Sequence, residues 1–169
     1  MTKTVEPIKI RGMFRLNIVE DRDGKETIVG DTGWKENLIV NGGFLNMVNQ
    51  MGTGLTGSKI SYAGLGTGTV PGATDTALNG EVYTNGSSSV VRAALTAATS
   101  STSKTLHNTA TFSSSNSFIT AAANISNVGL FNTSGPVTGT GTLLQGQTYA
   151  SSALATNQNV NLSYDLIFS

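Results

Sequence analysis

The titratable side chains that could carry out chemistry are few beyond the first 36 residues. His107 is the only histidine and cysteine is absent, so a catalytic triad or a zinc site would depend on a single imidazole. We therefore expect His107 to face solvent or lie in a turn. Asp75, Glu81 and Asp165 are the only acids in this part of the chain. Glycoside hydrolysis through Glu81 or Asp75 would need two acids to meet in a cleft. We instead expect Glu81 and Arg92 to pair, because a buried charge usually has a partner.

Two other patterns invite a binding-site interpretation, and neither fits its template. Four acids surround one turn, but Arg22 and Lys25 interrupt them and the alternating oxygen donors of an EF-hand are missing; the acids are Glu20, Asp21, Asp23 and Glu26. The glycines at 64, 66 and 68 give G-x-G-x-G rather than the G-x-G-x-x-G of a dinucleotide site. The first pattern is typical of a solvated charged turn and the second of turn or bulge glycines. No metal and no cofactor is expected.

Charge is distributed very unevenly along these 169 residues. The ten basic and ten acidic residues cancel, and 14 of these 20 lie in the first 36 positions. A neutral chain lacks the basic footprint that nucleic-acid binding needs. We expect no signal peptide, because the first residues are polar, and we expect no membrane association, because no apolar run approaches transmembrane length. The weakly charged remainder fits either low-complexity disorder or a β-scaffold whose surface is used in assembly contacts, and its strand patterns favour the second.

The first 33 residues predict a flexible arm, up to Pro7, followed by a charged β-hairpin. Apolar residues alternate from Ile8 to Ile18 with a basic outer row, which is typical of a half-buried strand. Asp23-Gly24 predicts a type I′ turn, and Thr27–Val29 then returns as the second strand. We interpret residues 1–33 as a docking segment and 34–169 as the body. The residues expected to contact a partner protein are Lys9, Arg11, Arg15, Arg22 and Trp34.

The segment that follows predicts the only helix. A short strand from Trp34 to Val40 leads to Asn41, a suitable N-cap, and Gly52 and Gly54 provide the stop. Four apolar residues share one face of this helix: Phe44, Met47, Val48 and Met51. A helix of about two turns is unstable alone in water, so we expect this face to pack on one end of a sheet.

The remaining chain predicts short strands separated by turns. The strands are expected near residues 60–64, 81–83, 90–95, 109–112, 125–131 and 143–149, and the clearest alternation runs from Val160 to Phe168. Eight or nine such strands with turn signals every 8–12 residues are typical of an antiparallel sandwich or jelly roll. The predicted fold is therefore all-β, a β-sandwich with one short helix, an N-terminal arm and a hairpin.

Three landmarks, taken in order, resemble a family of tailed-bacteriophage virion structural proteins. The first is W-x-x-N-L-I-V-N-G-G at Trp34–Gly43, leading into the helix. The second is I-x-Y-x-G-L-G-T-G-T from Ile60, followed by Leu78, Glu81 and Arg92. The third is N-V-G-L-F-N from Asn127, with Leu143-Leu144 and the alternating final strand. Asn127 departs from the family pattern, which often has an acid there. The resemblance covers roughly residues 34–168.

The resemblance implies a non-enzymatic virion building block with a β-sandwich fold, assembled in the host cytoplasm. It favours a capsid decoration, or cement, protein that stabilises the phage head; the alternative is a tail or neck fibre protein that binds the host surface. The expected partners are the major capsid protein or other virion proteins, and further copies of the chain in a homo-oligomer such as a trimer. A small glycan hydrolase is the competing hypothesis from another class.

Overall fold

The computed structural model describes residues 7–52, 59–82, 92–98, 104–116, 122–134 and 142–169. Strands make up most of this part of the chain, and every strand pairing in it is antiparallel, which confirms the all-β prediction. In chain order the elements are β1 (Ile10–Arg22), β2 (Lys25–Asp31), β3 (Lys35–Ile39), α1 (Asn41–Gly52), β4 (Tyr62–Gly66), β5 (Ala93–Ala94), β6 (Thr96–Ala98), β7 (Thr105–Phe112), the 3-10 turn η1 (Ser114–Asn116), β8 (Ala123–Phe131), β9 (Leu143–Leu154) and β10 (Gln158–Phe168).

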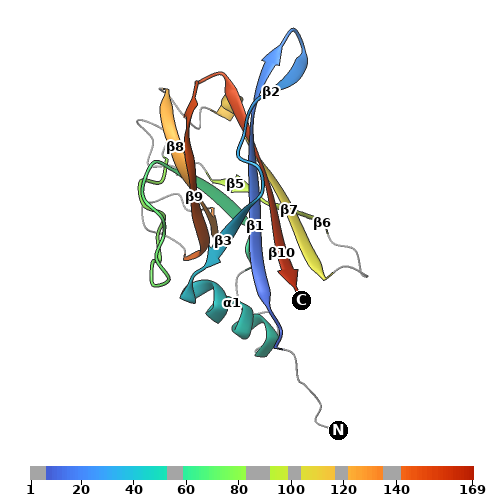
Figure 1. Cartoon of the computed structure of the whole chain (residues 1–169), viewed down its shortest axis with the longest axis vertical. Coiled ribbons are helices and arrows are strands. Elements are labelled where there is room, and N and C mark those ends of the chain that lie inside the picture. Colours follow the sequence, from blue (N-terminus) through green and yellow to red (C-terminus); the bar gives the residue numbers. More distant parts are fainter. Residues whose placement is uncertain (1–6, 53–58, 83–91, 99–103, 117–121, 135–141) are drawn as a thin grey trace.

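The strands form a sandwich that closes almost completely into a flattened barrel (Figure 1). They pair in the order β5-β4-β8-β9-β3-β1-β10-β7-β6, and β2 pairs with β1 beyond the end of β3. Two segments turn the corners between the layers. The first is β3, which pairs with β1 in one layer and with β9 in the other. The second is the segment 93–98, in which β5 pairs with β4 and β6 pairs with β7. Closure of this kind leaves few strand edges free for unwanted pairing.

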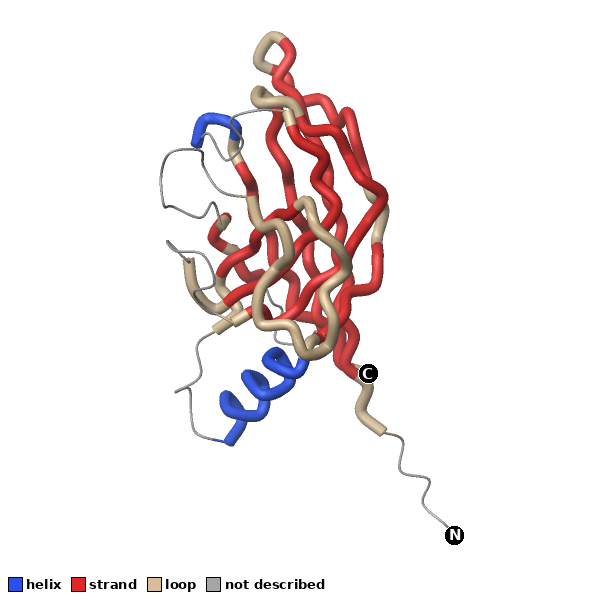
Figure 2. The backbone as a smooth tube through the Cα atoms, turned by 90° about the vertical axis from the view of Figure 1, so that its left-hand side faces the viewer, coloured by secondary structure: helices blue, strands red, loops and turns tan. Residues whose placement is uncertain are grey.

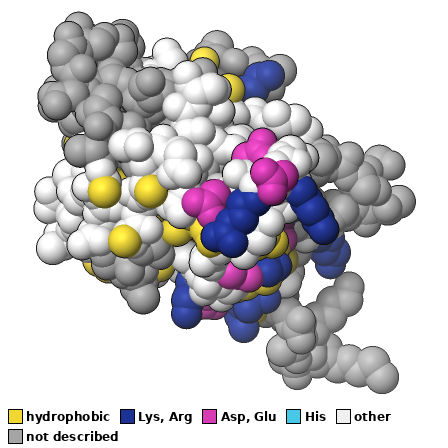
Figure 3. All heavy atoms as spheres, turned by 90° about the horizontal axis from the view of Figure 1, so that it is seen from above, with side chains coloured by type: hydrophobic (Ala, Val, Ile, Leu, Met, Phe, Trp, Pro, Cys, Tyr) yellow, Lys and Arg dark blue, Asp and Glu magenta, His cyan; other side chains and the backbone are white. Residues whose placement is uncertain are grey.

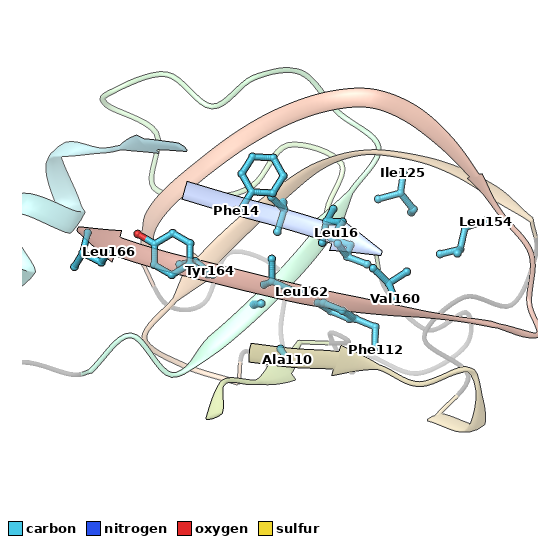
Figure 4. Packing of buried hydrophobic residues seen from close by; sticks show 14 of the residues in the cluster. Phe14, Leu16, Ala110, Phe112, Ile125, Leu154, Val160, Leu162, Tyr164 and Leu166 are labelled. Atoms are coloured by element: carbon cyan, nitrogen blue, oxygen red, sulfur yellow. The ribbon is translucent and has the colours of Figure 1, made fainter. Parts of the chain in front are cut away.

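The core lies between the two layers and is built from the alternating residues of β1, β7 and β10 together with β8 and β9 (Figure 4). Phe14 and Leu16 are buried as predicted, and the final strand buries every second residue at Val160, Leu162, Tyr164 and Leu166. The alternation of β1 changes at a bulge between Ile18 and Val19, after which Val19 is the buried residue. Ile8, predicted to start the buried row, is 81% exposed because it precedes the first strand pairing of β1.

A small polar group inside the barrel explains the glycine in the apolar row of β1. The Tyr164 hydroxyl donates to Gln145 Oε1, and Asn37 Nδ2 donates to the same oxygen at 3.3 Å. A Cβ on Gly12 would lie 2.9 Å from both Gln145 Oε1 and the Tyr164 hydroxyl, so a side chain at this position would displace the polar group. Burial raises the pKa of Tyr164 above its usual value of 10.0, so this hydroxyl remains a hydrogen-bond donor.

Strand β1 lies between β3 and β10 and contributes to the main core, so residues 10–22 pack as part of the barrel. The division at residue 33 into a docking segment and a body stays a prediction. The far end of the β1–β2 hairpin extends beyond the barrel at one end (Figure 1). Helix α1 lies at the opposite end (Figure 2), where Phe44 lines a groove together with Ile10 and Arg11 at the start of β1. Residues 1–6 of the predicted arm lie outside the described residues.

Candidate assembly surfaces

The five residues predicted to contact a partner are spread along the molecule and do not make one patch. Lys9 and Arg11 lie at the helix end, whereas Arg22 lies at the hairpin turn, beyond a 13-residue strand. At about 3.3 Å per residue that strand is about 40 Å long. Trp34 is 44% exposed and lies in the link between β2 and β3. Arg15 lies midway and is paired with Asp31. Contact of these residues with a partner stays a prediction, and such contacts would be made at separate places on the molecule.

Two of the predicted arginines have carboxylate partners near the surface. Arg15 donates from Nε and Nη2 to the two Asp31 oxygens at 2.9 and 2.5 Å. The Arg15 hydrogen bonds, helped by the Gly33 backbone N–H, lower the pKa of Asp31 from 3.8 to about 2. Arg22 donates to Glu20 at 2.8 Å. Arg15–Asp31 joins β1 to β2, whereas Arg22 and Glu20 lie on the same strand, and pairs near the surface contribute little energy each.

The hairpin tip, residues 20–28, is an exposed ribbon that contains most of the charge on the upper face of the molecule (Figure 3). Asp23 and Gly24 have φ values of 57° and 78°, as the predicted type I′ turn requires. Arg22 is paired in register with Lys25, and Asp21 with Glu26. Ile28 is 60% exposed. The predicted solvated charged turn is therefore confirmed, and its two faces carry opposite charge.

Helix α1 begins near the predicted residue, but only part of its apolar face is covered. The Val40 carbonyl accepts the N–H groups of Gly43 and Phe44 at 2.9 and 3.2 Å, and the helix then runs for 12 residues, about three turns rather than two. Gly43 is buried, and a Cβ there would lie only 2.1 Å from the Leu144 carbonyl oxygen. Met47 packs against the core as a partly buried residue. The first half of α1 therefore covers one end of the barrel, as predicted.

The rest of the predicted helix face is exposed, which corrects the expectation that it packs within the chain. Phe44, Val48 and Met51 are 47%, 58% and 79% exposed, and Leu45 is 61% exposed. Leu38, at the end of β3, is 38% exposed beside them. A groove of about 250 Å³ runs between these elements; it is lined by Ile10, Arg11, Gly12, Glu36, Asn37, Leu38, Ile39 and Phe44. We call this groove and the exposed face of α1 the helix-end surface.

The isolated charges Glu81 and Arg92 pair as predicted, deep in the molecule. Arg92 donates from Nε and Nη2 to the two Glu81 oxygens at 2.6 and 3.0 Å, and the two side chains are only 1% and 3% exposed. The guanidinium also lies 3.5 Å from the centre of the Phe131 ring and donates to the Thr133 carbonyl at 3.1 Å. Arg92 thus joins segments around β4 and β8 that are far apart in sequence, which is a structural role.

Asn127, the departure from the family pattern, is fully buried. Its Nδ2 donates to the carbonyls of Thr69 and Asn79 at 3.2 and 3.0 Å. A carboxylate at this position could not donate these hydrogen bonds. The chain segments around Thr69 and Asn79 lie so close together that a Cβ on Gly68 would lie 2.3 Å from the Asn79 carbonyl oxygen. The glycines after Tyr62 therefore serve close packing, and an amide at 127 suits the loop that they accommodate.

The remaining candidates for chemistry are occupied by structural contacts. His107, expected to face solvent or lie in a turn, is on β7 with its side chain 40% exposed, and its Nδ1 lies 2.5 Å from Oδ1 of Asp165 on the neighbouring strand. Asp75 accepts the Gly72 N–H at 2.8 Å within its own turn. In the described part of the chain, no three histidine, aspartate or glutamate side chains gather closely enough to hold a metal ion. None of the described helices is long and apolar enough to cross a membrane.

No family model, curated protein or solved structure matches this chain. The family suggested by the three landmarks therefore stays a prediction from the residues themselves.

Proposed function

We propose that this protein is a non-enzymatic structural component of a bacteriophage virion, and that it decorates and stabilises the assembled head. The observation that carries the proposal is the exposed apolar face of α1 at one end of an otherwise closed barrel. Phe44, Leu45, Val48 and Met51 are 47–79% exposed on a helix without a single charged residue. Apolar patches of this kind mark surfaces that a partner covers.

The hairpin supports the same proposal from the opposite end of the molecule. It extends a charged, two-stranded ribbon beyond the barrel, where it can reach a neighbouring subunit (Figure 1). On a symmetric shell each contact is repeated many times, so modest contacts are enough to hold a decoration protein in place. The three sequence landmarks, which resemble virion structural proteins, are the reason for proposing a phage particle as the assembly.

The alternative is a tail or neck appendage that binds the host surface. The hairpin tip and the helix-end surface lie at opposite ends of β1, and this arrangement favours an appendage as much as a decoration protein. One end could attach to the particle while the other faces outward. The two functions differ in what binds the purified protein. An appendage binds host cells or their surface polysaccharide, whereas a decoration protein binds the shell.

Shell stability tests the proposal. Particles that lack this protein are mixed with the purified chain, and the temperature at which they release DNA is measured. We expect added chain to bind at a fixed number of copies per head and to raise that temperature. The variant Phe44→Ser/Val48→Ser, which removes exposed apolar groups only, should bind more weakly. Absence of binding to heads, combined with binding to host cells, would replace the proposal by the appendage function.

A further inference from the structure

The hairpin tip carries two carboxylates that face each other without a cation between them. Asp21 and Glu26 are paired in register on β1 and β2, which places their Cβ atoms about 5 Å apart on one face. Like charges in this position destabilise a hairpin. The ion pairs of the described residues are Arg15–Asp31, Arg22–Glu20, Arg92–Glu81 and His107–Asp165, and neither Asp21 nor Glu26 is among them. A cation from outside would relieve their repulsion.

The same face of the ribbon also presents an apolar group. Side chains two residues apart on a strand share a face, so Ile28 lies beside Glu26, and it is 60% exposed. The opposite face differs, because Arg22 and Lys25 are paired there and Glu20 neutralises Arg22. We call Asp21, Glu26 and Ile28 the acidic face of the hairpin. It fits a partner surface that places a cation next to apolar side chains.

The helix-end surface has this combination. Arg11 lines the groove together with Leu38 and Phe44, and it takes part in none of the four ion pairs above. Lys9 lies two residues away and is exposed. Lys104 belongs to the same end, because its carbonyl accepts the N–H of Phe168. Lys59 lies just before β4, where the Ser61 N–H donates to the carbonyl of Phe131 at the end of β8.

Net charges of the two ends are equal and opposite. The hairpin tip has four acids (Glu20, Asp21, Asp23, Glu26) and two bases (Arg22, Lys25), which gives −2. The described charges at the helix end are five bases (Lys9, Arg11, Lys35, Lys59, Lys104) and three acids (Glu36, Asp75, Asp165), which gives +2. Opposite potentials steer surfaces together and fix their register. Because both members of the pair are on one chain, a second copy is the matching partner.

We propose that copies of this protein associate head to tail, with the acidic face of one hairpin seated on the helix-end surface of the next copy. Asp21 and Glu26 then face Arg11 and Lys9, and Ile28 covers part of the apolar groove. Such a contact joins two different surfaces, so repetition produces a ring or a chain of subunits. A tip of about nine residues buries less than the ~800 Å² per partner of a standard interface, so each contact is weak alone.

This inference does not depend on the proposed function, because it concerns the purified chain without any particle. Sedimentation velocity is measured from about 10 to about 500 μM, a range that brackets weak association, and at about 50 and 500 mM salt. We expect the average mass to rise with concentration at low salt. High salt should weaken the association, because charges near the rim of an interface are screened.

Two charge variants and their mixture identify the surfaces. Asp21→Asn/Glu26→Lys changes the hairpin tip from −2 to +1 and keeps an oxygen that can accept the Gly24 N–H, now 2.8 Å from Asp21. Lys9→Glu/Arg11→Glu changes the helix end from +2 to −2. Each variant alone should associate at least tenfold more weakly than the wild type. An equimolar mixture should associate again, because a positive tip then meets a negative helix end.

Lys25→Glu is the matched control, since it changes the charge of the same hairpin on its other face. It should associate at least as strongly as the wild type. Circular dichroism checks that every variant keeps its fold. A monomeric wild type at low salt and high concentration would overturn the proposal. So would self-association that survives both hairpin substitutions, which would indicate contact between like surfaces. If the lone protein is monomeric but its hairpin is needed for binding to particles, a different virion protein occupies this site and only the proposed function stands.

Discussion

Breaking the buried Glu81–Arg92 pair should destabilise the protein strongly. Both side chains are almost fully buried, and the pair shares two hydrogen bonds of 2.6 and 3.0 Å. Glu81→Met leaves the guanidinium buried without its anion. Removal of one partner from a buried pair costs about 3–5 kcal/mol. For a chain of this size, each kcal/mol lowers the melting temperature by about 2–4 °C, so we expect a fall of roughly 6–20 °C.

The double variant Glu81→Met/Arg92→Met provides the control. Replacing both charges by apolar groups of similar volume removes the uncompensated charge, and such exchanges are often neutral or stabilising. Urea unfolding of the wild type, both single variants and the double variant gives the coupling free energy. We expect the double variant to be more stable than either single variant. A loss below about 1 kcal/mol in Glu81→Met would refute the reasoning, because it would mean that the pair is solvated.

Two further predictions concern local packing and pH. Gly43→Ala should lower the free energy of unfolding by about 1–3 kcal/mol, because its Cβ would lie 2.1 Å from the Leu144 carbonyl oxygen. Gly52→Ala in the same helix is the control for the same urea titration. Nothing lies within 4 Å of a Cβ there, so this variant should lose no stability. In wild type, the lowered pKa of Asp31 means that its pairing with Arg15 stabilises the fold fully above pH 3.8, and that this contribution is lost as the pH falls through about 2. Asp31→Asn should therefore show a shallower loss of stability between these pH values, and an unchanged acid titration would contradict the assignment.

Local signals predicted the fold well. The Asp23-Gly24 turn, the alternation of β10 and the start of α1 depend on neighbours in sequence, and the structure confirms all three. The Glu81–Arg92 pair was predictable for a different reason, since two isolated charges in a weakly charged body have few other partners. The corner strand at 93–98 was partly predicted, but its Ala and Thr residues have no period that reveals pairing on both edges.

The candidate surfaces were predicted less well. A helical period identifies which side chains share a face, but it does not say whether the same chain covers that face, and Met51 is 79% exposed. Lys9 and Arg22 are close in sequence, yet an extended strand places them at opposite ends of the molecule. His107 gave no sequence signal for Asp165, because cross-strand partners depend on the register of β7 and β10.

Antibody-gold labelling of intact particles in the electron microscope tests the central claim most directly. The account predicts gold spread regularly over the head, as expected for a decoration protein. Gold confined to the neck or tail would keep a virion role but favour the appendage function. Purified particles without any label, from cells that contain the protein, would contradict the claim that this chain is a structural part of the virion.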